Sequence, residues 1–394
     1  MLLRATHDVR RNRRGSVVPI VGLLLTVLLG FLAMTFDLGR SAVVRTQLQG
    51  AADSAALAGA SALGTDNLLV SNGVQSGDMI TAQSRAQTFA QSNWFDLNGT
   101  KSVVLNTVND VTFGILTNPG DLSQSMAFSG SSPLNSVRVQ TSVDPSHGGS
   151  LTFLFAPILG QKTTTVQATA TATVQLFAVN SVKALTGLRS PILPITMSFS
   201  DWQQMVNNQT GQDTYQWSTT TGQMFSGSDG LQEQQLYPGS NVSSSNNGLI
   251  QFGTGSHSNA VLKDQILNGP TYDQMIAQWP PSGAPPWNAQ HQFTISADPG
   301  WRATTFDDLS SVEDGGNVRL IPLNDGTNPG NGGNGNYTIV ALAPVRVTYS
   351  NKGGKNGGYA LVQSAVIIDP TVVPSTTTLA GSGQGGVPVA RLTR

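Results

Sequence analysis

The stretch that decides the fold is Arg10–Ala62, RRNRRGSVVPIVGLLLTVLLGFLAMTFDLGRSAVVRTQLQGAADSAALAGASA. An uncharged run of twenty residues, Val17–Phe36, lies between a basic cluster and a segment of small residues. At about 1.5 Å per helical residue this run is about 30 Å long, the thickness of a bilayer's hydrocarbon core. No proline or obvious turn separates it from the small-residue segment. The sequence therefore predicts one helix that begins in a membrane and continues beyond it.

The charges on either side of the run predict how the chain crosses the membrane. Five arginines and one acid precede the run, whereas two arginines and two acids follow it through Ala62. The positive-inside rule therefore keeps the short N-terminus in the cytoplasm and exports the rest of the chain. The arginines nearest the run are Arg10, Arg11, Arg13 and Arg14.

Two other interpretations of the apolar run are open. A cleaved secretory signal has an apolar core of about 7–15 residues followed by a small-residue cleavage site. The present run is longer, and Gly30–Met34 offers only a poor site. A buried core helix of a soluble protein would not need the arginine flank. We therefore favour an uncleaved anchor, with the lipid bilayer as its partner.

Landmarks along this helix resemble the N-terminal segment of the TadE/TadG-like group of Flp (tight-adherence) pilus-assembly proteins. Arg14-Gly15-Ser16 precedes the span, FDLGR follows it at Phe36–Arg40, and LQGAADSAALAGA follows at Leu48–Ala60. In TadG-like chains the segment reads roughly R-G, membrane helix, D-x-G-R and L-Q-x-A-A-D-A-A-A-L-A-G-A. The residues that match are Asp37, Gly39, Arg40, Leu48, Gln49, Ala52, Asp53, Ala56, Leu57 and Ala58.

A second block further along resembles the same family. Its pieces are V-T-F-G at 111–114, S-V-R-V at 136–139, F-L-F-A-P-I-L-G at 153–160 and V-Q-A-T-A-T-A at 166–172. The resemblance implies a single-pass protein of the bacterial plasma membrane that helps to assemble or anchor a Flp pilus. It also implies action through contact between the N-terminal helix and other pilus-assembly proteins.

The exported part of the helix carries a narrow apolar seam with heptad-like spacing. Its members are Val44, Leu48, Ala51, Ala55, Ala58 and Ala62. Alanine at such positions lets another helix approach closely. The seam could dock other subunits or pack on the protein's own exported domain, and the sequence favours neither.

The composition beyond the helix indicates a weakly charged, folded exported chain. Charged residues make up 11% of the 394 residues, hydrophobic residues 39%, and the net charge is −1. Ordinary soluble domains contain about 25% charged residues. Outside the N-terminal cluster nothing suggests nucleic-acid binding. The chain has no cysteine, so it has neither disulfides nor a thiolate metal site.

We predict an α+β fold, in which a single N-terminal transmembrane helix extends into an exported pilin-like α/β region, followed by a mostly β C-terminal region. The predicted segments are a cytoplasmic N-terminus 1–16, the span 17–36, its exported continuation 37–64, a pilin-like domain 65–180, a β domain 181–370 and a disordered tail 371–394.

Periodicity and turn residues predict several individual elements. A second helix begins near Asp78, its expected N-cap, and LTFLFAPIL at 151–159 fits either a short helix or a buried strand. The clearest strands are 135–143 and 161–178, while 337–349 and 359–369 predict a hairpin. Short helices are expected at 259–268 and 271–279.

Candidate metal sites are weak. Asp121, Ser123 and Ser125 match D-x-S-x-S, the pattern with which von Willebrand A domains hold Mg²⁺, but a turn precedes them instead of a buried strand. The loop 324–336 and an acidic group could hold Ca²⁺, yet neither has EF-hand spacing. That group is Asp307, Asp308, Glu313 and Asp314. We expect no metal and no cofactor; the alternative function is a surface adhesin or ligand-binding module that is metal-dependent through Asp121.

Catalytic signals are equally poor. The chain holds no G-x-S-x-G, H-E-x-x-H or phosphate-binding loop. Its histidines are His7, His147, His257 and His291. We predict no enzyme activity and no small-molecule substrate, although a spatial Ser-His-Asp arrangement is not visible in a sequence.

Gly15-Ser16 could be a prepilin peptidase site. Flp-type pilins and pseudopilins then need Glu at the fifth mature position, where this chain has Ile20. The missing carboxylate argues against processing and against incorporation into a fibre, and the alternative is that Gly15 merely ends the basic cluster.

Overall fold

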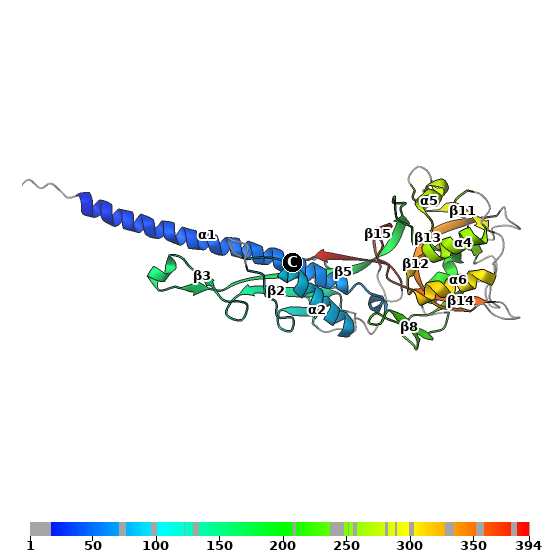
Figure 1. Ribbon diagram of the computed structural model, residues 1–394, viewed down its shortest axis with the longest axis horizontal. Coiled ribbons are helices and arrows are strands. Elements are labelled where there is room, and N and C mark those ends of the chain that lie inside the picture. Colours follow the sequence, from blue (N-terminus) through cyan, green and yellow to red (C-terminus); the bar gives the residue numbers. More distant parts are fainter. Residues whose placement is uncertain are drawn as a thin grey trace, which may run out of the picture.

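The computed structural model is an elongated molecule with one long helix along its side (Figure 1). The structure describes residues 17–393 apart from 71–75, 96–100, 122, 129–133, 208–209, 237–247, 251, 255–257, 280–282, 288–289, 299–302, 328–334, 352–357 and 380–383. The four arginines of the basic cluster and Gly15-Ser16 lie outside the described residues.

The long helix α1 is unbroken over 46 residues, Val17–Ala62. Pro19 falls in its first turn, where the missing N–H of proline removes no helical hydrogen bond. The continuous helix that the sequence predicts is therefore present, and it ends at Ala62 instead of at residue 64.

A second helix and a small antiparallel sheet cover the second half of α1. Helix α2 (Ser76–Gln91) and strands β2 (Ser136–Val143) and β5 (Val166–Val182) contact α1, and β1 (Val111–Gly114) pairs with β2. The core between them consists largely of alanine and valine. Helix α2 begins at Ser76, so Asp78 lies in its first turn and not at the N-cap position. We call this part of the chain the proximal region.

Strand β5 is the spine that joins this region to the rest of the molecule. It pairs with β2 through Val166–Thr173, then with β16 (Val387–Leu392), and at its far end with β15 (Val372–Thr378). At about 3.3 Å per residue such a strand is about 55 Å long.

The disorder predicted for residues 371–394 is wrong for 372–378 and 387–392, because these residues form β15 and β16 of the main sheet. Leu392 lies opposite Ala172 in β5, and Figure 1 shows the C-terminus returning beside α1. A Thr/Gly/Ser/Pro composition suggested a tail, but a free edge of β5 supplies the hydrogen-bond partners that the segment lacks by itself. Short strands of this kind are specified by their partner more than by their own residues.

The far end of the molecule is a mixed head, built around the hairpin of β13 and β14, in which Arg346 lies opposite Gln363. Its strands are β6 (Ile195–Ser198), β7 (Tyr215–Ser218), β8 (Gln223–Ser226), β9 (Gln234–Leu236), β10 (Gly248–Ile250), β11 (Phe293–Asp298), β12 (Val318–Asn324), β13 (Asn336–Asn351) and β14 (Tyr359–Ser364). Its helices are α3 (Phe199–Val206), α4 (Asn259–Asn268), α5 (Tyr272–Gln278) and α6 (Ala303–Asp314). The α+β prediction, the hairpin and the two short helices near 259–279 are confirmed.

A buried ion pair joins the end of α1 to this head. Asp66, in the short 3₁₀ helix η1 (Asp66–Leu69), accepts hydrogen bonds from Arg346 Nε at 3.1 Å and Nη2 at 2.7 Å. Its other oxygen accepts from the Val366 N–H at 2.6 Å, and the Arg346 guanidinium stacks on Trp217. Both side chains of this pair are buried. Loss of either charge would therefore leave the other charge buried and unpaired.

Candidate membrane anchor and assembly helix

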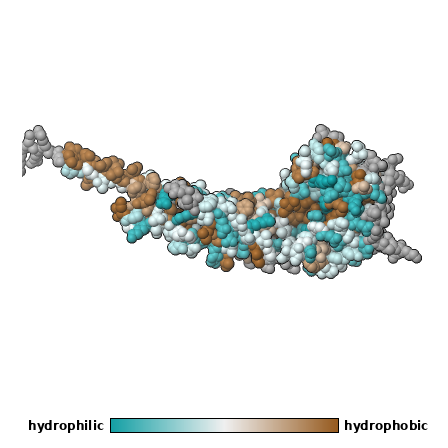
Figure 2. Space-filling view, viewed as in Figure 1, coloured by the Kyte–Doolittle hydropathy of each residue, from teal (hydrophilic) through white to brown (hydrophobic). Residues whose placement is uncertain are grey.

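The first half of α1 presents its large apolar side chains outward. Leu28, Phe31 and Leu32 are all more than half exposed, and the most apolar window of the helix has a mean hydropathy of 2.6 with none of it buried in the protein. Figure 2 shows this half as a brown column projecting from the folded part. Water-soluble surfaces rarely expose a contiguous apolar area of this size. Within the described ranges, α1 is the one helix long and apolar enough to cross a membrane.

The second half of the same helix buries its seam. Leu48, Ala51 and Ala55 are completely buried, and the other seam residues, Val44, Ala58 and Ala62, are nearly so. Their neighbours are α2 and strands β2 and β5 of the same chain. The seam thus packs on the protein's own domain in this structure, which leaves the opposite side of the helix exposed.

The D-x-G-R motif holds a distant loop through hydrogen bonds of Asp37 and Arg40, which we call the Asp37 clasp. The Asp37 carboxylate accepts hydrogen bonds from the N–H groups of Leu154 at 2.9 Å, Phe155 at 3.0 Å and Ala156 at 2.7 Å. Three residues on, Arg40 Nη1 donates to the Thr152 carbonyl oxygen at 2.7 Å. A carboxylate at the free N–H groups that begin a helical turn is a favourable capping arrangement.

This loop is the F-L-F-A-P-I-L-G piece of the second family-like block. The predicted choice between a short helix and a buried strand is resolved as a short strand followed by a short 3₁₀ helix. The loop is a two-stranded hairpin of β3 (Leu151–Thr152) and β4 (Thr163–Thr164) with the 3₁₀ turn η2 (Ala156–Leu159) at its tip. The two blocks of resemblance therefore meet at Asp37, which lies 117 residues before Leu154 in the sequence.

The L-Q-x-A-A-D motif has a packing role and a polar role. Ala52 and Ala56 are fully buried beside the seam. Gln49 Nε2 donates to Asp53 Oδ1 at 2.8 Å and to the Thr169 carbonyl oxygen of β5 at 3.2 Å, so it ties the helix to the sheet. Leu57 differs from them, because its side chain is 38% exposed on the outer side of the helix.

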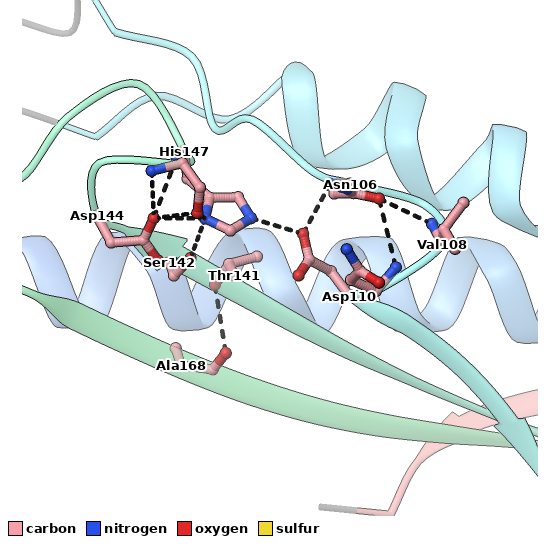
Figure 3. Close-up of polar contacts among 10 residues, drawn as sticks. Asn106, Val108, Asp110, Thr141, Ser142, Asp144, His147 and Ala168 are labelled. Atoms are coloured by element: carbon pink, nitrogen blue, oxygen red, sulfur yellow. Dashed lines mark hydrogen bonds and ion pairs between the residues drawn. The ribbon is translucent and has the colours of Figure 1, made fainter.

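His147 is the centre of a polar cluster at the end of β2 (Figure 3). Its Nδ1 lies 2.8 Å from Asp144 Oδ1, and its Nε2 lies 2.9 Å from Asp110 Oδ2. Burial by itself lowers the pKa of His147, but the hydrogen bonds with Asp144 and Asp110 raise it overall. With a carboxylate on each ring nitrogen, the imidazole holds the turn after β2 against the residue that precedes β1. A general base would need one nitrogen free for a substrate.

The candidate metal ligands are not brought together. Asp121 Oδ1 accepts from the backbone N–H of Ser123 at 2.9 Å and from its hydroxyl at 2.6 Å, while Ser125 is exposed in the same loop. Within the part of the chain that the structure describes, no group of three or more acids and histidines could hold a metal ion.

The calcium candidates have separate surroundings. Asp308 forms an ion pair with Lys263 at 3.5 Å. Burial raises the pKa of Glu313 to about 7. Asp325 instead accepts hydrogen bonds from Thr327 in its own turn.

The architecture defines a class of protein in which one long N-terminal helix is apolar and free in its first half and packed on an α/β domain in its second. Residues 15–62 match the family described as "Putative Flp pilus-assembly TadE/G-like", and residues 46–172 match the family described as "Putative Tad-like Flp pilus-assembly". Residues 15–172 are therefore similar to Flp pilus-assembly proteins of the TadE/G-like and Tad-like families. Searches of curated proteins and of solved structures found no match.

Sequence reasoning missed how the motif residues are used. The sequence identifies Asp37 and Arg40 as motif residues but not their partner, which is a loop of the second family-like block. The Asp66–Arg346 pair had no sequence signal, because a lone acid after a helix and an arginine in a strand are ordinary. The exposed Leu57 among buried neighbours could be found by counting helical positions from the seam.

Proposed function

We propose that this protein is a membrane-anchored component of a Flp/Tad-type pilus-assembly system. Val17–Phe36 crosses the bacterial plasma membrane once, residues 1–16 lie in the cytoplasm, and the chain from Asp37 onward lies outside. The observation that supports this most directly is the exposed apolar half of α1, which runs without a break into the domain that matches the Tad families.

The protein acts by contact and without catalysis. Because the seam is buried on the chain's own domain, the contact surface is the outer side of the second half of α1. The exposed residues on that side, beyond the hairpin tip, are Ala42, Thr46, Gly50, Leu57 and Ser61. Small residues there let a neighbouring helix come close. Leu57 matches the family motif and yet contributes little to the protein's own core, which suits a contact residue.

Piliation in the native bacterium tests this role. A strain that lacks the gene should lose surface pili, and the wild-type chain should restore them. Leu57→Asp should fail to restore pili although the protein is folded and present in membranes. Ile368→Asp is the matched control, since Ile368 is 75% exposed in the connection between β14 and β15 and should restore pili fully. Normal piliation without the protein, or with Leu57→Asp, would contradict the proposal.

The N-terminal residue of the mature protein tests the anchor separately. Intact mass should show an unprocessed Met1 end in the membrane fraction and no protein in sheared fibres. A Ser16 end in fibres would make the protein a pilus subunit. An end beyond Met34 would mean that the apolar run is a cleaved signal.

The metal-dependent adhesin, the alternative from the sequence, has no support from the geometry. The Ser123 hydroxyl donates a hydrogen bond to Asp121 Oδ1 in an exposed turn. The assembly role predicts that neither chelation nor Asp121→Ala changes piliation or attachment, whereas an adhesin of this type would lose attachment under both treatments.

A further inference from the structure

The β3–η2–β4 hairpin exposes an apolar tip beside the membrane-spanning half of α1. Ile158 is 85% exposed, and Leu154 and Phe155 are also exposed although they are large and apolar. Figure 1 shows the hairpin running under α1 toward the end from which the free half of the helix projects. In Figure 2 the brown surface of that helix continues onto this end of the folded part.

The tip overlaps the apolar span along the helix axis. An open groove of about 1030 Å³ separates α1 from the tip, and Phe155 and Ile158 line one wall. The other wall reaches back along α1 to Leu29, Leu32 and Ala33, which are within the span. Nearer the domain, the ring of Phe155 packs edge-on against Phe36 with centroids 6.0 Å apart. The tip is therefore level with the last turns of the span.

Most backbone N–H groups of the tip already have hydrogen-bond partners within the protein, as an environment without water requires. Asp37 accepts from three of these N–H groups, as described above, and Pro157 has no N–H. The Ile158 N–H donates to the Phe155 carbonyl, and the Gly160 N–H donates to the Pro157 carbonyl. Backbone donors without partners are what keeps ordinary loops out of lipid, and most of the donors at this tip have partners inside the protein.

We propose that the hairpin tip inserts into the leaflet on the domain side of the bilayer, and that lipid chains of that leaflet fill the groove. The inference rests on the proposed membrane span. Lipid is the occupant that the position favours, because the groove opens at the level of the span and continues its apolar surface. The Asp37 clasp holds the tip at this depth, so that helix and hairpin enter the membrane as a two-point anchor.

A charged residue between the tip and the paired strands of the hairpin fits the same placement. Lys162 is exposed, and its carbonyl oxygen accepts a hydrogen bond from the Phe153 N–H. A lysine there can extend its ammonium group to lipid headgroups while the tip lies deeper. Two insertion points restrict the tilt of the domain on the membrane, which a single flexible anchor does not.

Depth-resolved fluorescence quenching tests the insertion, and the absence of native cysteine makes specific labelling straightforward. Single-cysteine chains Ile158→Cys, Leu28→Cys and Ile368→Cys carry an environment-sensitive NBD label. They are reconstituted into phosphatidylcholine–phosphatidylglycerol vesicles with or without nitroxide-labelled acyl chains. Ile158 and Ile368 are similarly exposed isoleucines, so neither substitution disturbs a core.

We expect acyl-chain nitroxides to quench the labels at positions 158 and 28 severalfold more than the label at position 368. Quenching at 28 but not at 158 would overturn the inserted tip and leave the anchor intact. No quenching at 28 would instead overturn the membrane span itself. A blue-shifted but unquenched label at 158, with a shift that grows with protein-to-lipid ratio, would assign the groove to a second copy of the chain and also overturn the proposal.

Discussion

The two halves of α1 share one helical backbone and have opposite surroundings. Between Val17 and Phe36 the helix carries leucine, valine and phenylalanine, and these side chains contact little of the protein. Between Asp37 and Ala62 alanine and glycine dominate, and one whole side of the helix is buried. The half with the greater hydrophobicity is thus the exposed half.

The difference between the two halves shows that the size of the side chains decides what can pack against the helix. Alanine brings α1 close enough for α2 and the sheet to share one core, and a Cβ on Gly59 would already lie 3.2 Å from Val137 Cγ1. Large side chains hold other backbones away, but a fluid lipid phase fits around them at no packing cost. The Asp37 clasp lies at the border between the two halves.

The largest expected effect separates two leucine substitutions, one in each half of α1. Leu48→Asp places a charge in a fully buried site, so we expect the free energy of unfolding to fall by about 4 kcal/mol or more. Leu28→Asp should leave the unfolding of the folded part unchanged but disfavour membrane insertion by about 3 kcal/mol. Denaturant unfolding in mild detergent and membrane fractionation measure the two effects. Equal unfolding midpoints for both variants would contradict this division.

Glycine substitutions on opposite sides of the second half of α1 should change the stability in opposite directions. Gly59→Leu forces side-chain atoms into β2 and α2, and we expect it to lower the stability by about 1–3 kcal/mol. Gly50→Leu meets no atom within 4 Å of its new Cβ. It should raise the stability by up to about 1 kcal/mol through helix propensity. Denaturant unfolding of both variants checks the opposite signs; a loss of stability in Gly50→Leu would mean that the outer side is also packed.

The clasp at the border predicts a local effect of intermediate size. Asp37→Ala removes the acceptor of three N–H groups, so amide hydrogen exchange at Leu154, Phe155 and Ala156 should accelerate by about tenfold or more. Asp37→Asn keeps a neutral acceptor oxygen and should fall between. The Val139 amide in β2 serves as the control and should not change. Uniform acceleration at all four amides would show general unfolding instead of a released loop.

Elements whose residues have a clear periodicity and propensity were predictable from the sequence. The length of the span, the β-branched alternation of β2 and β5 and the helix at Asn259–Asn268 follow from period and propensity alone. The resemblance located the motif residues but not their contacts. The seam spacing indicated a buried face without saying whether the partner was another subunit or the chain's own domain.

Features that depend on a distant partner were not predictable. The strand at Val387–Leu392 exists because β5 offers a free edge, and nothing within those six residues announces it. The clasp needs the fold to bring Asp37 to residues 154–156. In the C-terminal segment, pairing with β5 therefore decides the structure in place of the local composition. The role of Asp37 in the family motif is visible only from its contact with the distant loop.

The smallest expected effect concerns pH, and it again separates the halves, because Val17–Phe36 has no titratable side chain. The raised pKa of His147 means that its protonation contributes stability that is complete below pH 6.5 and disappears as the pH rises through the folded-state pKa. Thermal unfolding in detergent should show this loss in the wild-type chain above pH 6.5 and not in His147→Gln. Glu313, whose raised pKa favours the protonated form, adds its own loss between about pH 4.5 and 7, but this is common to both chains and cancels in their difference. A wild-type profile parallel to that of His147→Gln would show that the cluster in Figure 3 orders its turn without stabilising the proximal region.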